Sequence, residues 1–511
     1  MGGDVPYHAL FDGSASTQPV TDVTVATLLR CSMGLSAWKQ YRSARWALRV
    51  NPSSGNLHPT ESYLIRAGRV SHYAPREHAL EERSTLGSPA WAAYSAERDG
   101  FLVALTSIPW REAWKYGERA FRYCQHDAGH ALAALRCAAA LLGWRLTLLP
   151  WTDTQIAAVL GLDRTADFAG AEAEEPECIA VVTPGDVEPW LVADPAPLTA
   201  AAHAVEWAGR ANALSPARVE WPIIGEVTRA TRRVGAESGD RRIRLAGREV
   251  RSPEPALTGR AGAAEQPGSA RPTRQSSARS IILQRRSAVA FDARSTLPRA
   301  TFLSMLARTR AGRPNPPWDA IDWPPQVHLL LFVHRVAGLT PGVYAYLRDR
   351  SVLDEWRAAM RAEFLWEPAN DPNDPNDPND PNDLFLLLPF DVGWVANRVS
   401  CDQDIAADGF FSLGMIARLE SSLRERGDWF YRRLFWECGV LGQILYLEAE
   451  AAGARGTGIG CFYDDPVHDA AGLSGMEWQS LYHFSMGVPV DDDRLTTERG
   501  YVWEAGPPGR A

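Results

Sequence analysis

Two stretches of this 511-residue chain carry the same helical pattern, 310 positions apart. In each stretch apolar residues recur at spacings of three and four, the period of a helix with one buried face. These apolar positions are Ala128, Leu132, Leu135, Ala139 and Leu142 in the first stretch, and Leu434, Cys438, Leu441 and Leu445 in the second. The same shift superimposes Phe121 on Tyr431, Arg122 on Arg432, Gly129 on Gly439 and Gly143 on Gly453. The pattern predicts a structural unit that occurs twice.

A second correspondence lies upstream, in the same order. Strand-like Tyr63-Leu64-Ile65 leads to Arg69-Val70, as Leu329-Leu330-Leu331 leads to Arg335-Val336. Each is followed by a Tyr seven residues before a Leu, at Tyr73 and Leu80 and at Tyr346 and Leu353. Two matches in one order predict a tandem duplication, so that the chain is a covalent pseudo-dimer. Irregular alternation of strands and helices predicts an α+β fold, with helices packed on a sheet in each half.

The segment 215–280 separates the two halves. It is rich in Arg, Gly, Pro, Ser and Glu, which is typical of a linker, and only Trp221-Pro222-Ile223-Ile224 looks able to pack. We therefore expect one domain over residues 1–214 and a second over residues 281–511. Residues 370–383 repeat Asn-Asp-Pro, which predicts a solvated surface loop without a function of its own.

Bulk composition excludes several classes of protein. The net charge is -9 without a basic stripe, which argues against nucleic acid as a partner. The N-terminus lacks the pattern of a signal peptide. The most apolar stretch, residues 131–150, contains Arg136 and Arg145, so no membrane span is expected. Seven cysteines without a C-x-x-C pair suit a reducing compartment. We expect a cytoplasmic protein.

Four motifs carry the chemistry. They are Asn51-Pro52-Ser53-Ser54-Gly55-Asn56-Leu57-His58-Pro59, Lys115-Tyr116-Gly117-Glu118-Arg119, Leu283-Gln284-Arg285-Arg286-Ser287 and Gly456-Thr457-Gly458-Ile459-Gly460. In this order they resemble the nitroreductase superfamily, and within it the SagB/ThcOx-type dehydrogenases, which include oxidases of peptide thiazolines and oxazolines. The resemblance covers nearly the whole chain apart from the linker and the Asn-Asp-Pro tract. It implies two fused nitroreductase-like domains that bind FMN.

The resemblance also implies how the cofactor site is built. Members of the superfamily are typically homodimers with FMN at the interface; the Arg-Arg-Ser and glycine segments come from one subunit and the P-S-x-x-N segment from the other. Here only the first half carries the P-S-S-G-N string, and the aligned residues 318–325 read Trp-Asp-Ala-Ile-Asp-Trp-Pro-Pro. Only the second half carries Arg-Arg-Ser. We expect one FMN site across the halves, a lost second site, and a monomer in solution.

The expected cofactor residues divide by chemistry. Arg285, Arg286 and Ser287 offer cations and a hydroxyl to a phosphate, although they could equally be a solvated helix cap. Ser53, Ser54 and Asn56 could bind the ribityl chain and the pyrimidine edge, or simply form a turn. The glycines of the motif 456–460 could let the backbone approach a flat ring, or they could simply end a helix. Arg494 is expected as a further cation for the phosphate. The whole expected set is Pro52, Ser53, Ser54, Asn56, His58, Arg285, Arg286, Ser287, Gly458, Ile459, Gly460 and Arg494.

Lys115 and Tyr116 are the candidate catalytic pair. In the azoline oxidases a Lys-Tyr pair at this place is implicated in catalysis, and it could take the ring proton while hydride goes to flavin N5. Arg111 and Arg119 nearby could lower the pKa of the lysine. The alternative is a surface lysine beside a half-buried tyrosine. A metal site at Cys124, His126 and His130 lacks further ligands, so no metal is expected, and His130 is placed near the flavin instead.

These motifs predict an FMN-dependent dehydrogenase or oxidase that passes hydride from a small-molecule or peptide substrate to flavin N5, with azoline-to-azole oxidation as one form. One alternative is an NAD(P)H-dependent reductase of nitroaromatics or quinones. Another, of a different class, is a non-catalytic flavin-binding subunit of a peptide-modifying complex. The substrate is not identified by the sequence.

Overall fold

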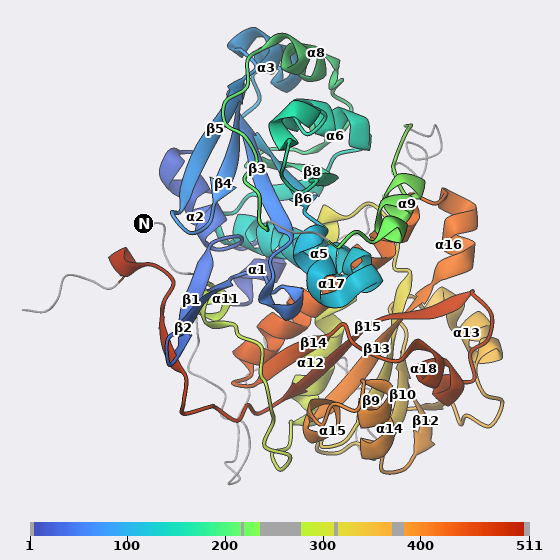
Figure 1. Cartoon of the computed structure of the whole chain (residues 1–511). Coiled ribbons are helices and arrows are strands. Elements are labelled where there is room, and N and C mark those ends of the chain that lie inside the picture. The colour runs from blue at the N-terminus through green and yellow to red at the C-terminus, as the bar shows by residue number, and fades with distance from the viewer. Residues whose placement is uncertain (1–4, 216–218, 236–276, 311–314, 370–382, 505–511) are drawn as a thin grey trace, which may run out of the picture.

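The computed structural model describes residues 5–215, 219–235, 277–310, 315–369 and 383–504. In this part of the chain two large antiparallel sheets lie at opposite ends, and two long helices cross between them (Figure 1). One sheet comes from residues before the expected linker and the other from residues after it. The expected α+β architecture with two sheet-and-helix halves is therefore confirmed.

The sheet of the first half has the order β5-β4-β3-β6-β8-β7, with every pair antiparallel. Its strands are β3 (Thr60–Arg66), β4 (Arg69–Ala74), β5 (Ala79–Thr85), β6 (Phe101–Ser107), β7 (Arg145–Leu148) and β8 (Glu175–Thr183). Apolar side chains on one face, such as Ile65 and Val181, pack against short helices. These helices are α3 (Ser88–Ser95), α6 (Asp153–Leu160), α7 (Glu188–Leu191) and α8 (Ala196–Ala204). The other face packs on the long helix α5 (Ala120–Leu141).

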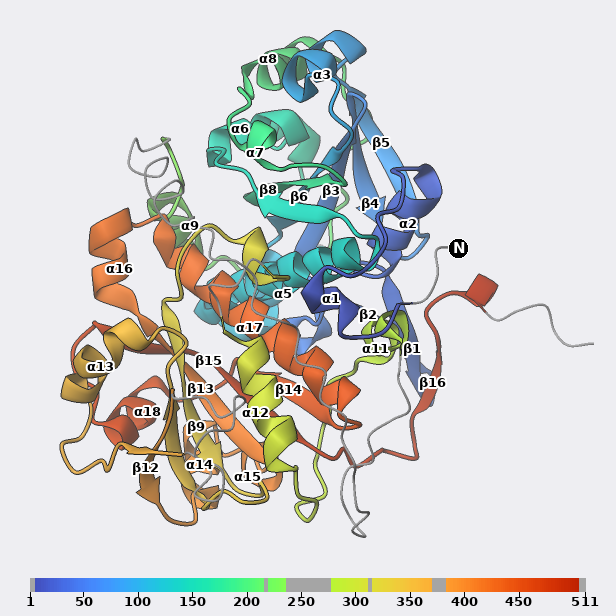
Figure 2. The same cartoon turned by 180° about the vertical axis from the view of Figure 1, so that it is seen from behind.

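The second sheet has the order β11-β12-β10-β9-β13-β15-β14. Its strands are β9 (Val327–Val333), β10 (Gly342–Tyr346), β11 (Glu367–Pro368), β12 (Leu384–Pro389), β13 (Phe411–Arg418), β14 (Arg455–Ile459) and β15 (Trp478–Gly487). One face is covered by α13 (Leu353–Ala359), α14 (Gly393–Val399), α15 (Ile405–Asp408) and α18 (Asp464–Ala471). The other face packs on α12 (Arg299–Arg308), α16 (Leu419–Arg426) and the long helix α17 (Phe430–Ala451), as seen from behind in Figure 2.

Six strands take the same positions in the two sheets. The pairs are β3 and β9, β4 and β10, β5 and β12, β6 and β13, β7 and β14, and β8 and β15. Two of these pairs, β6 with β13 and β7 with β14, start 310 residues apart, like the long helices. The upstream match is partial, because Arg69 and Val70 open β4, whereas Arg335 and Val336 lie in the connection between β9 and β10. Similarly, Leu80 lies in β5 but Leu353 opens a helix.

The two long helices cross at their matching glycines. Both helices have 22 residues, and both were predicted from the apolar period. A Cβ at Gly129 would overlap the carbonyl oxygen of Trp436, and a Cβ at Gly439 would lie 2.7 Å from the backbone nitrogen of His130. Phe121 and Tyr431 stack with ring centroids 6.1 Å apart. Residues related by the 310-residue shift therefore face one another, as they do across a two-fold axis.

A third sheet joins the two ends of the chain. Strand β1 (Leu35–Tyr41) pairs antiparallel with β2 (Ala44–Arg49) and with the C-terminal strand β16 (Thr496–Arg499). The N-terminal helices α1 (Ala9–Asp12) and α2 (Asp22–Arg30) pack against α5. On the side of the second half, the Tyr7 hydroxyl donates to Glu448 of α17 at 2.8 Å. Both ends of the chain therefore contribute to the contact between the halves.

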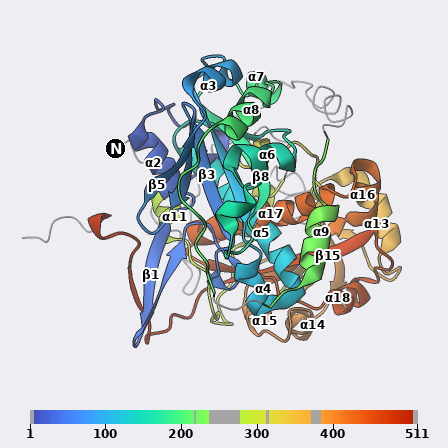
Figure 3. The same cartoon turned by 45° about the horizontal axis from the view of Figure 1, so that its top comes forward.

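The expected linker is partly described. Trp221–Ile224, the stretch predicted to pack, leads into helix α9 (Pro222–Ala230), which runs beside α5 (Figure 3). Ile224 is buried there against Ala113 and Phe121. Helix α11 (Ala278–Gln284) includes the last three residues of the expected linker, which was predicted to end at residue 280. Residues 236–276, and most of the Asn-Asp-Pro tract, lie outside the described residues, while Asp383 pairs with Arg310 at 2.7 Å. Among the described helices, none combines the length and apolar character needed to cross a bilayer.

Candidate functional site

A cavity of about 470 Å³ lies between the two halves. The first half contributes β1, β2, the loop 51–58, Tyr116 and α5; the second contributes residues 285–289, the end of β14, Tyr446 and Tyr482. Eleven of the twelve expected cofactor residues line it: Pro52, Ser53, Ser54, Asn56, His58, Arg285, Arg286, Ser287, Gly458, Ile459 and Gly460. The size is typical of a pocket for a cofactor-sized molecule.

The loop 51–58 is a tight turn held by its own side chains. Gly55, Asn56 and His58 all have left-handed backbone conformations, with φ of 58°, 60° and 53°. The Ser53 hydroxyl accepts a hydrogen bond from the His58 backbone N–H at 2.8 Å. The Asn56 side-chain N–H donates to the Ala47 carbonyl at 2.9 Å, and its oxygen lies 2.9 Å from His58 Nε2. The Asn56 amide thus stabilises the turn. These residues both form a turn and line the cavity.

Arg285 and Arg286 form a buried cationic corner at the end of α11. The Arg285 guanidinium donates to the Arg49 carbonyl at 3.2 Å, and its Nε is buried without a partner. Arg286 donates to the carbonyls of Ser36 at 2.9 Å and Arg285 at 2.6 Å. Burial lowers the pKa of both guanidinium groups, that of Arg286 to about 9, with a further contribution from Arg285. Glu450 stabilises both charges through space, but no described carboxylate forms an ion pair with either side chain.

Two further cations, Lys39 and Arg49, line the same corner. Burial and Arg455 lower the pKa of Lys39, and burial lowers that of Arg49. Sequence reasoning missed both residues, since they reach the cavity only because the β1–β2 hairpin folds over it. Sequence reasoning also missed Trp46 and Leu48 of this hairpin, Gln403 between α14 and α15, and Leu495 just before β16, because no local motif marks them as cavity residues. A corner rich in buried cations without carboxylate partners is arranged to accept an anion.

The glycine segment forms another wall. Gly458 lies in β14, and its N–H donates to the Tyr446 hydroxyl at 2.8 Å, which also lies 2.9 Å from the Ser287 Oγ. A Cβ at Gly456, Gly458 or Gly460 would overlap Phe484, Tyr482 or Tyr123, respectively. The glycines are therefore required by aromatic rings packed behind the wall. The helix-ending role proposed as an alternative belongs to Gly453, whose φ is 71°.

A buried pair of acids, Asp127 on α5 and Glu112 on α4 (Trp110–Tyr116), lies beside the loop 51–58. Asp127 lines the cavity, and its Oδ1 accepts hydrogen bonds from the Ser54 N–H at 3.0 Å and hydroxyl at 3.2 Å. Asp127 Oδ2 and both Glu112 oxygens have no partner. Burial raises the pKa of Asp127 to about 7; burial and Asp127 raise that of Glu112 to about 10. The pair therefore holds at least one proton at neutral pH.

Sequence reasoning missed the acid pair. Neither acid belongs to a motif identified in the sequence, and acidic side chains are more often exposed than buried. His130, expected near the flavin, does line the cavity, with Nε2 3.2 Å from the Tyr482 hydroxyl. Burial and Arg285 lower the pKa of His130 to about 3, so its imidazole is neutral. No group of three or more metal-binding side chains occurs in the described parts of the chain.

The candidate catalytic pair is divided by the structure. Tyr116 lines the cavity and meets Tyr123 edge to face at 4.7 Å. Lys115 is exposed outside the lining, with its Nζ 5.0 Å from the centre of the Tyr116 ring. Of the two arginines expected to assist it, Arg111 pairs with Glu61, and Arg119 pairs with Asp464 at 2.5 Å. Neither arginine is therefore an uncompensated charge beside the lysine.

Arg494, the remaining expected phosphate cation, lies outside the cavity lining. Its side chain is 72% exposed and forms an ion pair with Asp492 at 2.7 Å. The next residue, Leu495, does line the cavity. In this structure the cationic corner is formed instead by Arg285, Arg286 and the two cations of β1 and β2, Lys39 and Arg49.

Comparisons with known proteins support the fold. No family model and no curated protein matches the chain. A solved structure of a protein from Anabaena variabilis, assigned as a nitroreductase, matches over 96% of this chain and 92% of its own, with a TM-score of 0.63 and 18% identity. The E. coli microcin synthetase McbBCD complex with truncated pro-MccB17 is 19% identical over 34% of this chain and 67% of its own. Its TM-score of 0.26 is too low to support an argument. The chain thus has the α+β nitroreductase fold, built as two fused nitroreductase-like halves.

Proposed function

We propose that this protein is an FMN-dependent oxidoreductase with one composite cofactor site. The observation that carries the proposal is the cavity itself, which brings the loop 51–58 of one half together with residues 285–287 and 458–460 of the other. These segments are far apart in sequence, and each was predicted to bind one part of FMN.

The residues present fit FMN on chemical grounds. Buried Arg285, with its unpartnered Nε–H, and half-buried Arg286 and Lys39 supply positive charge that suits a phosphate. Ser54 and Ser287 supply hydroxyls to a polyol chain. Tyr116, Tyr123 and Tyr446 supply flat apolar walls, as a ring system requires. The site therefore contains a group for each chemical part of the cofactor.

Bound FMN supplies a two-electron acceptor for the hydride of a substrate. The arginines hold the phosphate, and the loop 51–58 excludes water from the wall that it forms. Neutral His130 adds no charge to the interior. Tyr116 is the member of the expected catalytic pair that faces the cavity, where its hydroxyl can hydrogen-bond a bound substrate.

We further propose that the substrate is oxidised, as in the SagB/ThcOx-type dehydrogenases, with azoline-to-azole conversion as the specific reaction. The support is the Lys115-Tyr116 motif together with the position of Tyr116 in the cavity wall. A substrate that reduces the flavin without NAD(P)H is expected on this proposal. Reduction by NAD(P)H alone, with no turnover of azoline peptides, would instead favour a nitro or quinone reductase.

We also propose that the two halves, residues 1–214 and 281–511, arose by tandem duplication and act as one pseudo-dimer. The shift of 310 residues recurs in the long helices, in β6 and β13 and in β7 and β14, and the six matched strands have one order. Because the contact between the halves is already intramolecular, we expect a monomer in solution.

The decisive experiment counts flavin. The purified chain is incubated with FMN, freed of excess ligand and denatured, and the released flavin is measured by absorbance per mole of chain. We expect one FMN per chain. Two per chain would contradict a single composite site, and none would contradict the oxidoreductase proposal.

A further inference from the structure

Two cysteines far apart in sequence touch at the edge of the cavity. Cys401 follows α14 and Cys461 follows β14, and their sulfur atoms are 2.9 Å apart. Cys461 is exposed and lines the cavity, while Cys401 is half-buried beneath it. The other five cysteines are buried, so Cys401 and Cys461 are the two thiols that are accessible to solvent.

We infer that Cys401 and Cys461 form a reversible dithiol site that a small-molecule disulfide oxidises to an intramolecular disulfide, tying the loop 400–404 to the end of β14. A disulfide has an S–S distance of about 2.0 Å, so the sulfurs need only a small further approach. Gln403 of this loop also lines the cavity. The bond would therefore join two parts of the cavity wall.

Hydrogen bonds already hold the loop 400–404 and the end of β14 next to each other. The Gln403 side chain donates to the carbonyls of Ser400 at 2.8 Å and Cys461 at 3.1 Å. The Tyr463 N–H donates to the Val399 carbonyl at 3.0 Å. From the first half, Arg119 donates to the carbonyls of Gly460 and Phe462, both at 3.2 Å. Because five carbonyls on both sides of the pair are held this way, little order remains to be imposed when the bond forms.

The reaction is a pair of thiol–disulfide exchanges. The Cys461 thiolate attacks one sulfur of the small disulfide, forms a mixed disulfide and releases one small thiolate. Cys401, as its thiolate, then attacks Cys461 Sγ and releases the second small thiol. Two protein thiols are oxidised and one small disulfide is reduced to two thiols, so electrons and protons balance. Burial and Cys461 raise the pKa of Cys401 to about 12, which assigns the first attack to Cys461.

The test incubates the full folded chain with oxidised glutathione, removes the reagent, denatures the chain, and counts the thiols by alkylation and intact mass. In the wild type we expect five of the seven cysteines to remain alkylatable and no glutathione to stay attached. Peptide mapping should recover Cys401 joined to Cys461. Dithiothreitol should restore all seven thiols. Seven alkylatable cysteines after oxidation, or a stable glutathione adduct on the wild type, would overturn the inference.

Single serine variants separate the two roles. Cys401→Ser leaves the attacking thiol without its partner, so one glutathione should remain on Cys461. Cys461→Ser should take up less, because the remaining thiol, Cys401, is half-buried whereas Cys461 is exposed. Equal labelling of both variants would contradict the assigned order. The reaction uses no flavin, so it should proceed identically in chain prepared with or without FMN, whatever the outcome of the flavin count.

The tie between the segments is tested by stability. Closing a disulfide between positions 401 and 461 should raise the Tm of the oxidised wild type by about 5 °C over the reduced form. Neither serine variant should change its Tm on addition of oxidised glutathione. An oxidised wild type that melts with the reduced form would show that the bond does not restrain the loop.

Discussion

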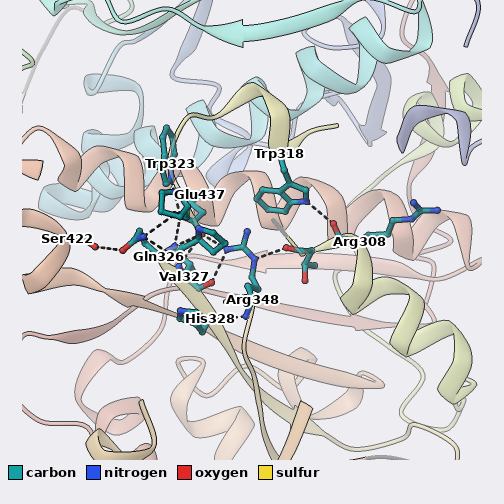
Figure 4. A network of polar contacts seen from close by, with 12 residues as sticks. Arg308, Trp318, Trp323, Gln326, Val327, His328, Arg348, Ser422 and Glu437 are labelled. Carbon is teal, nitrogen blue, oxygen red and sulfur yellow. Dashed lines mark hydrogen bonds and ion pairs between the residues drawn. The ribbon is translucent and has the colours of Figure 1, made fainter. Parts of the chain in front are cut away.

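The two long helices carry an acid at matching positions, yet the surroundings of the two acids differ. Asp127 of α5 faces the cavity, and one of its oxygens has no partner. Glu437, 310 residues later on α17, is fully buried and forms an ion pair with the equally buried Arg348. It also accepts hydrogen bonds from the Trp323 indole at 3.0 Å and from the backbone N–H groups of Gln326 and Val327, both at 3.1 Å. Figure 4 shows these side chains converging on Glu437.

The same contrast extends to the neighbours of each acid. Glu112 beside Asp127 has no hydrogen-bond partner, whereas Ser422, at the matching position near Glu437, donates to the Gln326 side chain at 2.9 Å. Gly456 and Gly458 of β14 are matched in β7 by Leu146 and Leu148, both buried in the core. The closed counterpart thus pairs its acid within the second half, and side chains of β7 from the first half fill the matching space.

The cations differ in the same way. Helix α11 is followed by Arg285 and Arg286, while α1, which precedes α2 as α11 precedes α12, is followed by Gly13 and Ser14. The residues that keep one site open are therefore split between the halves. The open site therefore retains glycines, unpaired buried charge and unsatisfied oxygens. In the closed counterpart, larger side chains replace the glycines, and the charges and oxygens have partners.

The largest expected effect is the loss of the ion pair in the closed region. Arg348→Met leaves Glu437 buried without its cation, so we expect the free energy of unfolding to fall by about 3–5 kcal/mol. Urea denaturation followed by tryptophan fluorescence measures the change.

Two matched variants make this test specific. Arg348→Met combined with Glu437→Leu removes both charges and should recover most of the loss. Arg424→Ala breaks the exposed pair with Glu420 and should cost less than about 1 kcal/mol. If Arg348→Met were no more damaging than Arg424→Ala, the closed region would not depend on its internal charge pairing.

The next effect concerns the open region. Arg285→Ala removes a buried guanidinium that the proposed phosphate would satisfy, so the Kd for FMN should rise about 100-fold. Fluorescence titration with FMN measures the affinity. Arg494→Ala is the matched control, because that side chain lies outside the cavity and pairs with Asp492. Weakening of similar size in both variants would contradict the phosphate role of the buried corner.

The sequence predicts those parts of the fold and of the cavity that depend on contacts between residues close together in the chain. Period and spacing predicted both long helices, and motifs predicted eleven cavity residues, because these signals are local. Lys39, Arg49 and Asp127 could not be found in this way. They reach the cavity through a hairpin closed by the C-terminal strand and through a helix packed between two sheets, and neither arrangement leaves a local pattern.

The placement of Arg494 and Lys115 shows the opposite limit. Both were carried over from a resemblance, Lys115 with the motif Lys115–Arg119 and Arg494 by its position after the last strand-like stretch. Yet Arg494 is paired with a residue two positions away, and Lys115 points away from the lining. A motif fixes which residue types are available, but long charged side chains choose between cavity and solvent according to partners that the motif does not include.

The smallest effect distinguishes the two acids of the open region by pH. Burial raises the pKa of Asp127 to about 7; burial and Asp127 raise that of Glu112 to about 10. The folded state therefore binds more protons than the unfolded chain above about pH 4, and its stability should fall as pH rises toward those values. Between pH 5 and 8 this loss should appear as a steady decline in the free energy of unfolding. Glu112→Gln keeps the shape of the side chain but cannot ionise, so it should flatten the decline, and Asp127→Asn should do so to a lesser extent. Urea unfolding at each pH measures the slope. A wild type as stable at pH 8 as at pH 5, or a Glu112→Gln variant with an unchanged slope, would show that the open region has neutralised its acids as completely as Arg348 neutralises Glu437.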